Sequence, residues 1–216
     1  MGMGVDTLKQ PGREFHSLLD AMDGIAYIVD ADGTILDVGQ KSWTEFARQN
    51  GSADWNGRSM IGRSLFAMID GPEVREIQRS LHERVYRGEG NHVTYEFRCD
   101  APDAERHMRM SMCAIMDDDA VAGVLYQSQI LSEVSRIPLP LFSSESRIAR
   151  FNDYRDDQIA ALCSYCNDVG WPVGAVRNED RICISAYEYY RRGGPADVVV
   201  SHGVCPPCFE RLITGE

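Results

Sequence analysis

The chain has 216 residues, of which 44% are hydrophobic and 25% are charged. These values are ordinary for a globular protein and exclude a disordered tail or a fibrous protein. The formal net charge of −11 argues against a nucleic-acid partner, because binding to phosphates needs clustered lysine and arginine. We expect a cytoplasmic protein without a membrane partner, because no apolar run approaches the roughly 20 residues that span a bilayer and no export signal is recognisable.

The sequence predicts two folded parts joined by a connector. Pro138 and Pro140, followed by two serines, predict an extended proline/serine linker over residues 137–150. The length allows one domain of average size and a small second unit. We therefore expect an N-terminal helix over residues 1–24, an α/β domain over 25–136 and a cysteine-bearing module over 151–216.

Hydrophobic periodicity predicts the elements of the N-terminal part in chain order. The first is a helix with an apolar stripe at helical spacing, formed by Phe15, Leu18, Leu19 and Met22. Strands over 25–29 and 34–38 follow, joined by an Asp-Gly turn. Helices are predicted around 42–47 and from Pro72 onward, and strands over 93–99, 108–116 and 121–130. The order is one helix, two strands, a set of helices and three strands.

Three stretches of this part resemble the PAS family of sensory domains. Residues 26–33 resemble the opening hairpin of that family, 61–65 its mid-domain helix entry, and 97–102 (FRCDAP) a segment of one bacterial branch. The resemblance covers residues 15–135. It implies an α+β fold with a five-stranded antiparallel sheet, flanking helices and a ligand cavity on one face. It also implies a bacterial signal sensor or adaptor that binds a small ligand or a downstream signalling protein and forms a homodimer through its N-terminal helix.

We expect the cavity to be lined by one face of a strand. Met108, Met110 and Met112 share that face because they alternate along the chain, and Tyr95 is expected beside them. Thioether side chains suit both core packing and ligand contact, and both interpretations stay open. His82 lies about 95° from the centre of the apolar stripe of the helix that starts at Pro72, so we expect it at the surface or half-buried. In PAS domains a histidine from this region can bind haem, so haem or flavin is an alternative cofactor.

Catalytic motifs are not recognisable. The chain shows no Ser/His/Asp order, Walker loop, glycine-rich dinucleotide turn or HExxH motif. We expect a protein that is not an enzyme.

Four of the seven cysteines form two C-x2-C pairs, with 38 residues between Cys166 and Cys205. Two such knuckles complete a tetrahedral four-sulfur site, which zinc prefers, and a metal there would supply folding free energy to a small module. We predict zinc bound by Cys163, Cys166, Cys205 and Cys208, with iron as a less favoured metal. Two alternatives are a thiol-based redox sensor that uses these cysteine pairs and a set of unrelated reduced thiols.

The residues around the cysteines also resemble a known module. Residues 163–166, Trp171 and residues 201–208 resemble a C-terminal module, CSxC…W…SHGxCPxC, that follows PAS or receiver segments in bacterial signalling proteins. His202 is an alternative metal ligand, but four cysteines already complete the site, so we expect it beside the ligands instead. We expect Trp171 and Tyr187 to pack over the knuckles.

Overall fold

The computed structural model describes residues 13–49, 56–90, 92–142, 159–174 and 181–214. Their contacts form two compact units. Unit 1 comprises Met1–Ile69, Arg75–Thr94 and Arg109–Gln129, and unit 2 comprises Asp70–Val74, Tyr95–Met108 and Ile130–Glu216. Each unit therefore draws on separate stretches of chain, and the domain boundaries expected from the sequence stay a prediction.

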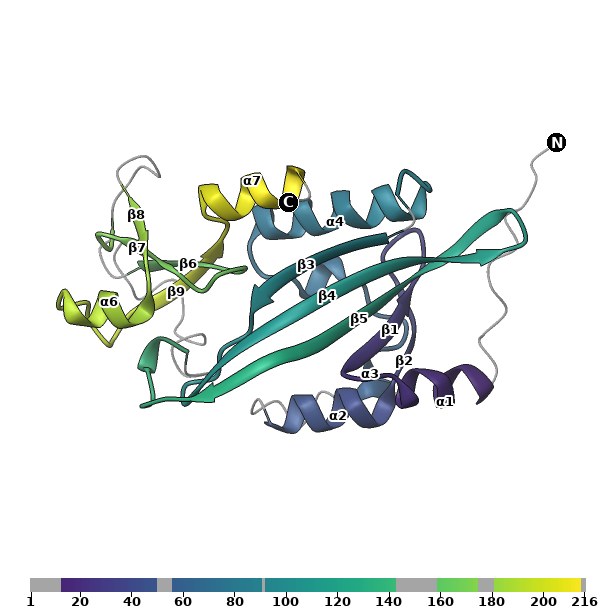
Figure 1. Cartoon of the computed structure of the whole chain (residues 1–216), viewed down its shortest axis with the longest axis horizontal. Helices are drawn as coiled ribbons and strands as arrows, with labels where there is room; N and C mark the ends of the chain where they lie inside the picture. Colours follow the sequence, from purple (N-terminus) through teal and green to yellow (C-terminus); the bar gives the residue numbers. More distant parts are fainter. Residues whose placement is uncertain (1–12, 50–55, 91, 143–158, 175–180, 215–216) are drawn as a thin grey trace. The chain divides into compact units, whose positions relative to one another are not determined.

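The N-terminal part has the predicted order of elements (Figure 1). These are α1 (Arg13–Ala21), β1 (Ile25–Val29), β2 (Ile35–Val38), α2 (Gln40–Gln49), α3 (Gly57–Met60), the 3-10 helix η1 (Phe66–Met68), α4 (Pro72–Tyr86), β3 (His92–Arg98), β4 (Ala104–Asp117) and β5 (Ala120–Ser135). The strands form one antiparallel sheet in the order β2-β1-β5-β4-β3. This confirms the predicted α+β class. The last strand, β5, continues for five residues beyond the predicted end at Ile130. These five residues are exposed, so the apolar run that predicted the strand stops before the strand itself does.

The turn between β1 and β2 shows why the hairpin forms where the sequence predicted it. The side chain of Asp30 accepts hydrogen bonds from the backbone N–H groups of Asp32 and Thr34, at 3.0 and 2.7 Å. Gly33 has a φ of 86°, which glycine adopts without strain, and a Cβ there would lie 2.2 Å from the ring of Phe66. Glycine is therefore required both by the turn and by the neighbouring ring.

Apolar side chains cover both faces of the sheet in unit 1. One face packs α1 against β1 through Leu19, Ala26 and Ile28, with Met22 beside them. The other carries an aromatic cluster that includes Tyr27 and Trp43. Two residues of the stripe predicted for dimerisation, Leu19 and Met22, therefore cover the core of their own unit, whereas Leu18 is 60% exposed. The side chain of Phe15 lies outside the described residues, and the homodimer stays a prediction.

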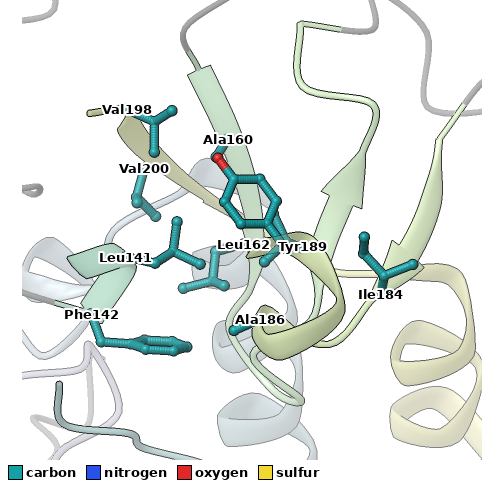
Figure 2. Close-up of a cluster of buried hydrophobic side chains, with 10 residues drawn as sticks. Leu141, Phe142, Ala160, Leu162, Ile184, Ala186, Tyr189, Val198 and Val200 are labelled. Carbon is teal, nitrogen blue, oxygen red and sulfur yellow. The ribbon is translucent and has the colours of Figure 1, made fainter. Parts of the chain in front are cut away.

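Unit 2 contains a second sheet, of four strands. Its elements are the 3-10 helix η2 (Pro140–Phe142), β6 (Ile159–Cys163), β7 (Val169–Trp171), β8 (Ile182–Ile184), α6 (Ala186–Arg191), β9 (Val199–Gly203) and α7 (Pro206–Thr214), with the strand order β8-β7-β6-β9. A core of 10 buried residues lies between the sheet and α6 (Figure 2). Tyr189 is fully buried in it, and its hydroxyl donates to the carbonyl of Pro195 at 2.8 Å. The module thus has an apolar core that its cysteines do not provide.

The first part of the predicted proline/serine linker packs in unit 2 as far as Phe142. Leu141 and Phe142 belong to the core and are 1% and 3% exposed. The backbone N–H of Leu139 donates to the carbonyl of Pro102, and that of Leu141 donates to the hydroxyl of Tyr190, both at 2.9 Å. The apolar residues between and after the two prolines are therefore used for packing, and the bounds of the linker stay a prediction. Residues 143–150 lie outside the described residues.

A buried carboxylate organises the same region. The side chain of Asp100, fully buried, accepts hydrogen bonds from Arg98 at 2.5 Å and from Arg136 at 2.7 Å. Arg136 also donates to the carbonyl of Ala101 and lies over the ring of Phe142, 4.5 Å from its centroid. The FRCDAP segment thus joins the turn between β3 and β4 to the end of β5.

No helix among the described residues is long and apolar enough to cross a membrane.

We predict that Asp100→Ala lowers the free energy of unfolding by roughly 3 kcal/mol, because it removes the buried carboxylate that Arg98 and Arg136 share. Urea denaturation of the wild type and the variant measures this difference. Glu45→Ala is the matched control, since Glu45 forms an ion pair with Arg48 in which both side chains are exposed, and it should leave the unfolding midpoint unchanged. Equal effects of the two substitutions would show that the Asp100 cluster does not stabilise the fold.

Candidate metal centre

The four predicted cysteines converge in unit 2. The Sγ atoms of Cys163, Cys166, Cys205 and Cys208 all lie within 4.8 Å of one another. Three of these residues are buried and Cys166 is half-buried. The structure therefore brings together the complete set of cysteines that the spacing predicted.

The two knuckles meet because β6 and β9 pair in parallel. Their register places Cys163 opposite Gly203, two residues before Cys205. The N–H of Ser164 continues the pairing beyond the strand and donates to the carbonyl of Gly203 at 2.9 Å. A parallel pair delivers the ends of both strands to the same edge of the sheet, so each strand leads directly into one knuckle.

The first knuckle is the turn between β6 and β7. Within it, the N–H of Asn167 donates to the carbonyl of Cys163, and the N–H of Cys163 donates to the carbonyl of Asp168. Asn167 has a φ of 58°, a left-handed conformation that asparagine tolerates better than most residues. The N–H of Tyr165 points back to the Sγ of Cys163 at 3.5 Å. The turn therefore directs both sulfurs to one side and gives one of them a backbone donor.

The second knuckle is the beginning of α7. Pro206 and Pro207 occupy its first positions, where a helix needs no N–H donors, and the N–H of Phe209 donates to the carbonyl of Cys205. Cys208 lies three residues after Cys205, so both sulfurs are on one side of the helix start. The side chain of Arg211 donates to the Sγ of Cys208 at 3.5 Å. The positive end of the helix and this guanidinium place positive charge beside these sulfurs.

Within the cluster, hydrogen bonds and burial shift the pKa values of the thiols in different directions. The pKa of Cys163 is lowered to about 4, mainly because the Cys166 thiol donates a hydrogen bond to it, and also because backbone N–H groups, including that of Cys205, donate to it. The pKa of Cys166 is raised by the same shared proton. Burial raises the pKa of Cys208 to about 12. One thiolate is therefore favoured from the start, and a metal ion would displace the protons of the others.

This donor set fits a tetrahedral thiolate site. Four sulfurs that each lie about 2.3 Å from a central ion are roughly 3.8 Å apart. The Sγ atoms of Cys166 and Cys205 are 3.7 Å apart. Soft thiolate ligands in this arrangement suit zinc or iron rather than magnesium or calcium. The cluster can therefore hold a metal ion.

His202 lies beside the cluster but does not belong to it. It is half-buried, and its Nδ1 lies 3.2 Å from a carboxylate oxygen of Asp70. The role of metal ligand considered for it stays a prediction. Trp171 packs on the core, with its ring 5.9 Å from that of Tyr189. Tyr187, expected to pack over the knuckles, is 75% exposed, because α6 turns Tyr189 inward instead.

The four residues predicted to line a ligand cavity are divided between the units. Tyr95 belongs to unit 2, where its ring contacts that of Tyr165 at 5.6 Å between centroids. Met108, also in unit 2, is buried, and Met110 in unit 1 is half-buried. Met112 is buried in unit 1, and its sulfur accepts a hydrogen bond from the side chain of Gln78 at 3.5 Å. Their role as ligand contacts stays a prediction.

His82 is fully buried, which corrects the expectation of a surface or half-buried position. Its Nε2 lies 2.9 Å from the carbonyl of Asp30 and its Nδ1 2.9 Å from the hydroxyl of Tyr126. Because a carbonyl only accepts, Nε2 carries the proton and Nδ1 accepts from the tyrosine. The apolar stripe alone defines too narrow a buried face for α4, because that face also includes the polar residue Gln78. Both ring nitrogens are engaged, so an axial bond to haem iron would break one hydrogen bond.

A scan against protein-family models matches no family, and a search of curated proteins finds no relative. Solved structures resemble part of the chain. A Vibrio cholerae VqmA dimer structure is 15% identical over 56% of this chain and 53% of its own, with a TM-score of 0.38. The PAS domain of Bordetella pertussis BvgS is 11% identical over 55% of this chain and 85% of its own, with a TM-score of 0.43.

A third structure is the PAS domain of the Cronobacter turicensis quorum-sensing receptor RpfR in complex with BDSF. It is 13% identical over 51% of this chain and 96% of its own, with a TM-score of 0.34. The chain spans little more than half the length of the VqmA chains that it matches. No residue's role follows from these likenesses.

We predict that His82 makes stability depend on pH. Burial lowers its pKa below 6.5, so the folded state binds this proton less readily than the unfolded state does. The stability that buried, neutral His82 contributes is therefore present above pH 6.5 and is lost as the pH falls below this value. The urea midpoint should decrease less between pH 7 and pH 5.5 in His82→Gln than in the wild type. His92→Gln, at an exposed histidine, is the control and should behave as the wild type. Equal decreases in all three proteins would contradict the assignment.

Proposed function

We propose that the chain is a bacterial signal-sensing adaptor in which a PAS-like domain is coupled to a structural zinc centre. The observation that carries the proposal is the convergence of four cysteine sulfurs within 4.8 Å of one another. Structural zinc sites use this donor set and this geometry. The proposal includes a cytoplasmic location and a downstream partner protein, and it assigns no catalytic reaction to the chain.

Zinc, when bound, would neutralise part of the negative charge of the four thiolates and link them through one ion. The chain's own residues do the rest. Cys163 and Cys166 present the sulfurs of one turn, and Cys205 and Cys208 those of one helix start. Backbone N–H groups and Arg211 donate to sulfur and reduce its remaining negative charge. The centre would thus hold β6, β9 and α7 as one body.

The strand ends in unit 2 supply a route by which sensing reaches this centre. The backbone N–H of Arg98, the last residue of β3, donates to the carbonyl of Tyr165 at 2.8 Å. Tyr165 lies between the two cysteines of the first knuckle. Its buried ring contacts the ring of Tyr95, which lies on β3 with Arg98. A displacement of β3 therefore changes contacts of the knuckle directly. A ligand would drive it only to the extent that it binds one arrangement better than the other.

Zinc binding is tested by elemental analysis of the full chain purified under reducing conditions. We expect close to one equivalent of zinc in the wild type and loss of that metal in Cys205→Ser and Cys208→Ser. Cys113→Ser is the matched control, since that thiol belongs to unit 1, and it should keep its metal. A folded wild type with reduced thiols and no metal would contradict the proposal, and iron in place of zinc would contradict the identity of the ion.

The sensing role is tested by native mass spectrometry and an absorption spectrum of the same preparation. A bound small molecule, lost on denaturation, would support a ligand-sensing domain. Haem or flavin absorption would instead favour the cofactor alternatives. Haem bound through His82 would also require the hydrogen bonds of this side chain to rearrange. The NMR resonances of the His82 ring would report that change. A domain that binds neither a small molecule nor a cofactor would leave protein binding as its means of sensing.

A further inference from the structure

A fifth thiol lies beside the four-cysteine cluster. Cys183 on β8 is exposed to solvent and lines the same cleft of unit 2 as Cys205. It is not one of the four sulfurs that lie within 4.8 Å of one another. No sequence motif points to Cys183, because it stands alone in the chain and is brought to this cleft only by the pairing of the strands.

A row of small residues across the second sheet joins Cys183 to the cleft. Cys183 pairs with Gly170 between β8 and β7, and Ala161 pairs with Ser201 between β6 and β9. A Cβ on Gly170 would lie 3.5 Å from the Cβ of Ala161, so these pairs form one continuous row. Small side chains along this row leave a cleft of about 420 Å³ above the sheet.

The cleft exposes sulfur atoms of the cluster. Cys163, Cys183 and Cys205 all line it, together with polar residues such as Ser201 and His202. Cys205 is otherwise buried, so the cleft is its path to small solutes. A small polar oxidant can therefore reach the sulfur of Cys205 from the side on which the spare thiol of Cys183 lies.

We propose that Cys183 and Cys205 form a disulfide when the protein meets a peroxide, and that this bond removes Cys205 from the metal. In the first step the thiolate sulfur of Cys205 attacks a peroxide oxygen. An S–O bond forms, the O–O bond breaks, and hydroxide leaves. In the second step the sulfur of Cys183 attacks the sulfenic sulfur of Cys205. An S–S bond forms, the S–O bond breaks, and the Cys183 proton leaves with the hydroxyl group as water.

The two sulfurs together lose two electrons, and the peroxide is reduced to one hydroxide and one water. The disulfide leaves three thiolates, and a four-coordinate structural site that loses one ligand holds its metal less tightly. The release of metal rests on the zinc centre proposed above, whereas the disulfide needs only the two thiols. Cys166, 3.7 Å from Cys205, is the competing partner, but it does not line the cleft through which the oxidant reaches Cys205.

The experiment treats the zinc-loaded full chain with hydrogen peroxide and has two readouts. Peptide mass spectrometry under non-reducing conditions maps the disulfides, and a chromogenic chelator follows the released zinc. We expect a cross-linked peptide that joins Cys183 to Cys205, and zinc release that dithiothreitol reverses. Cys183→Ser should start with as much zinc as the wild type and lose both the cross-link and the reversible release.

Two controls keep the outcomes distinct. Cys113→Ser, which removes a thiol of unit 1, should behave as the wild type, and Cys183→Ala replaces Cys183→Ser if the serine variant does not fold. A disulfide between Cys166 and Cys205 or between Cys163 and Cys166, or reversible release that persists without Cys183, would overturn the inference. Absence of zinc before peroxide is added would count against the metal centre alone, because the mapped disulfide still tests the pairing of Cys183 with Cys205.

Discussion

The parallel pairing of β6 with β9 is the constraint on which the cysteine module depends. These strands are far apart in the sequence, and their register sets Cys163 opposite Gly203. One knuckle therefore begins where β6 ends, and the other follows two residues after the end of β9. A shift of the register by one residue would turn each side chain of β9 to the other face of the sheet and separate the knuckles. The apolar core beneath the sheet holds this register, since alternate residues of the same strands, such as Ala160 and Leu162, are buried in it (Figure 2).

Unit 2 is more than a small module at the end of the chain. It includes the end of β3, the beginning of β4 and the end of β5, so these strand ends and the cysteines belong to one unit. Arg98 has two roles here, because its side chain pairs with buried Asp100 while its backbone N–H donates to Tyr165 in the first knuckle. The FRCDAP segment is thereby explained in physical terms. Its arginine and aspartate fix the turn between β3 and β4 and, through Arg136, the chain that leaves β5.

The sequence predicted the features that depend on local patterns. The Asp-Gly turn, the alternation in the strands of the N-terminal part and the spacing of the paired cysteines each reflect neighbours along the chain. The features that it missed depend on neighbours across elements. Cys183 reaches the cluster through its pairing with Gly170, and His82 is buried because Asp30 and Tyr126 satisfy both of its ring nitrogens. The prolines before Phe142 predicted an extended connector, because nothing local indicates that Leu141 and Phe142 enter a core formed by strands later in the chain.

A metal bound by the four cysteines should also order the end of β3, where Arg98 contacts the first knuckle. Amide hydrogen exchange of the full chain, with zinc bound and after chelation under reducing conditions, measures this effect. We expect the amides of Arg98 and Ser164 to lose protection when the metal is removed, because the carbonyl groups of Tyr165 and Gly203 that they donate to are positioned by the knuckles. The amides of β1 in unit 1 should keep their protection. Unchanged protection of Arg98 and Ser164 in the metal-free protein would contradict the claim.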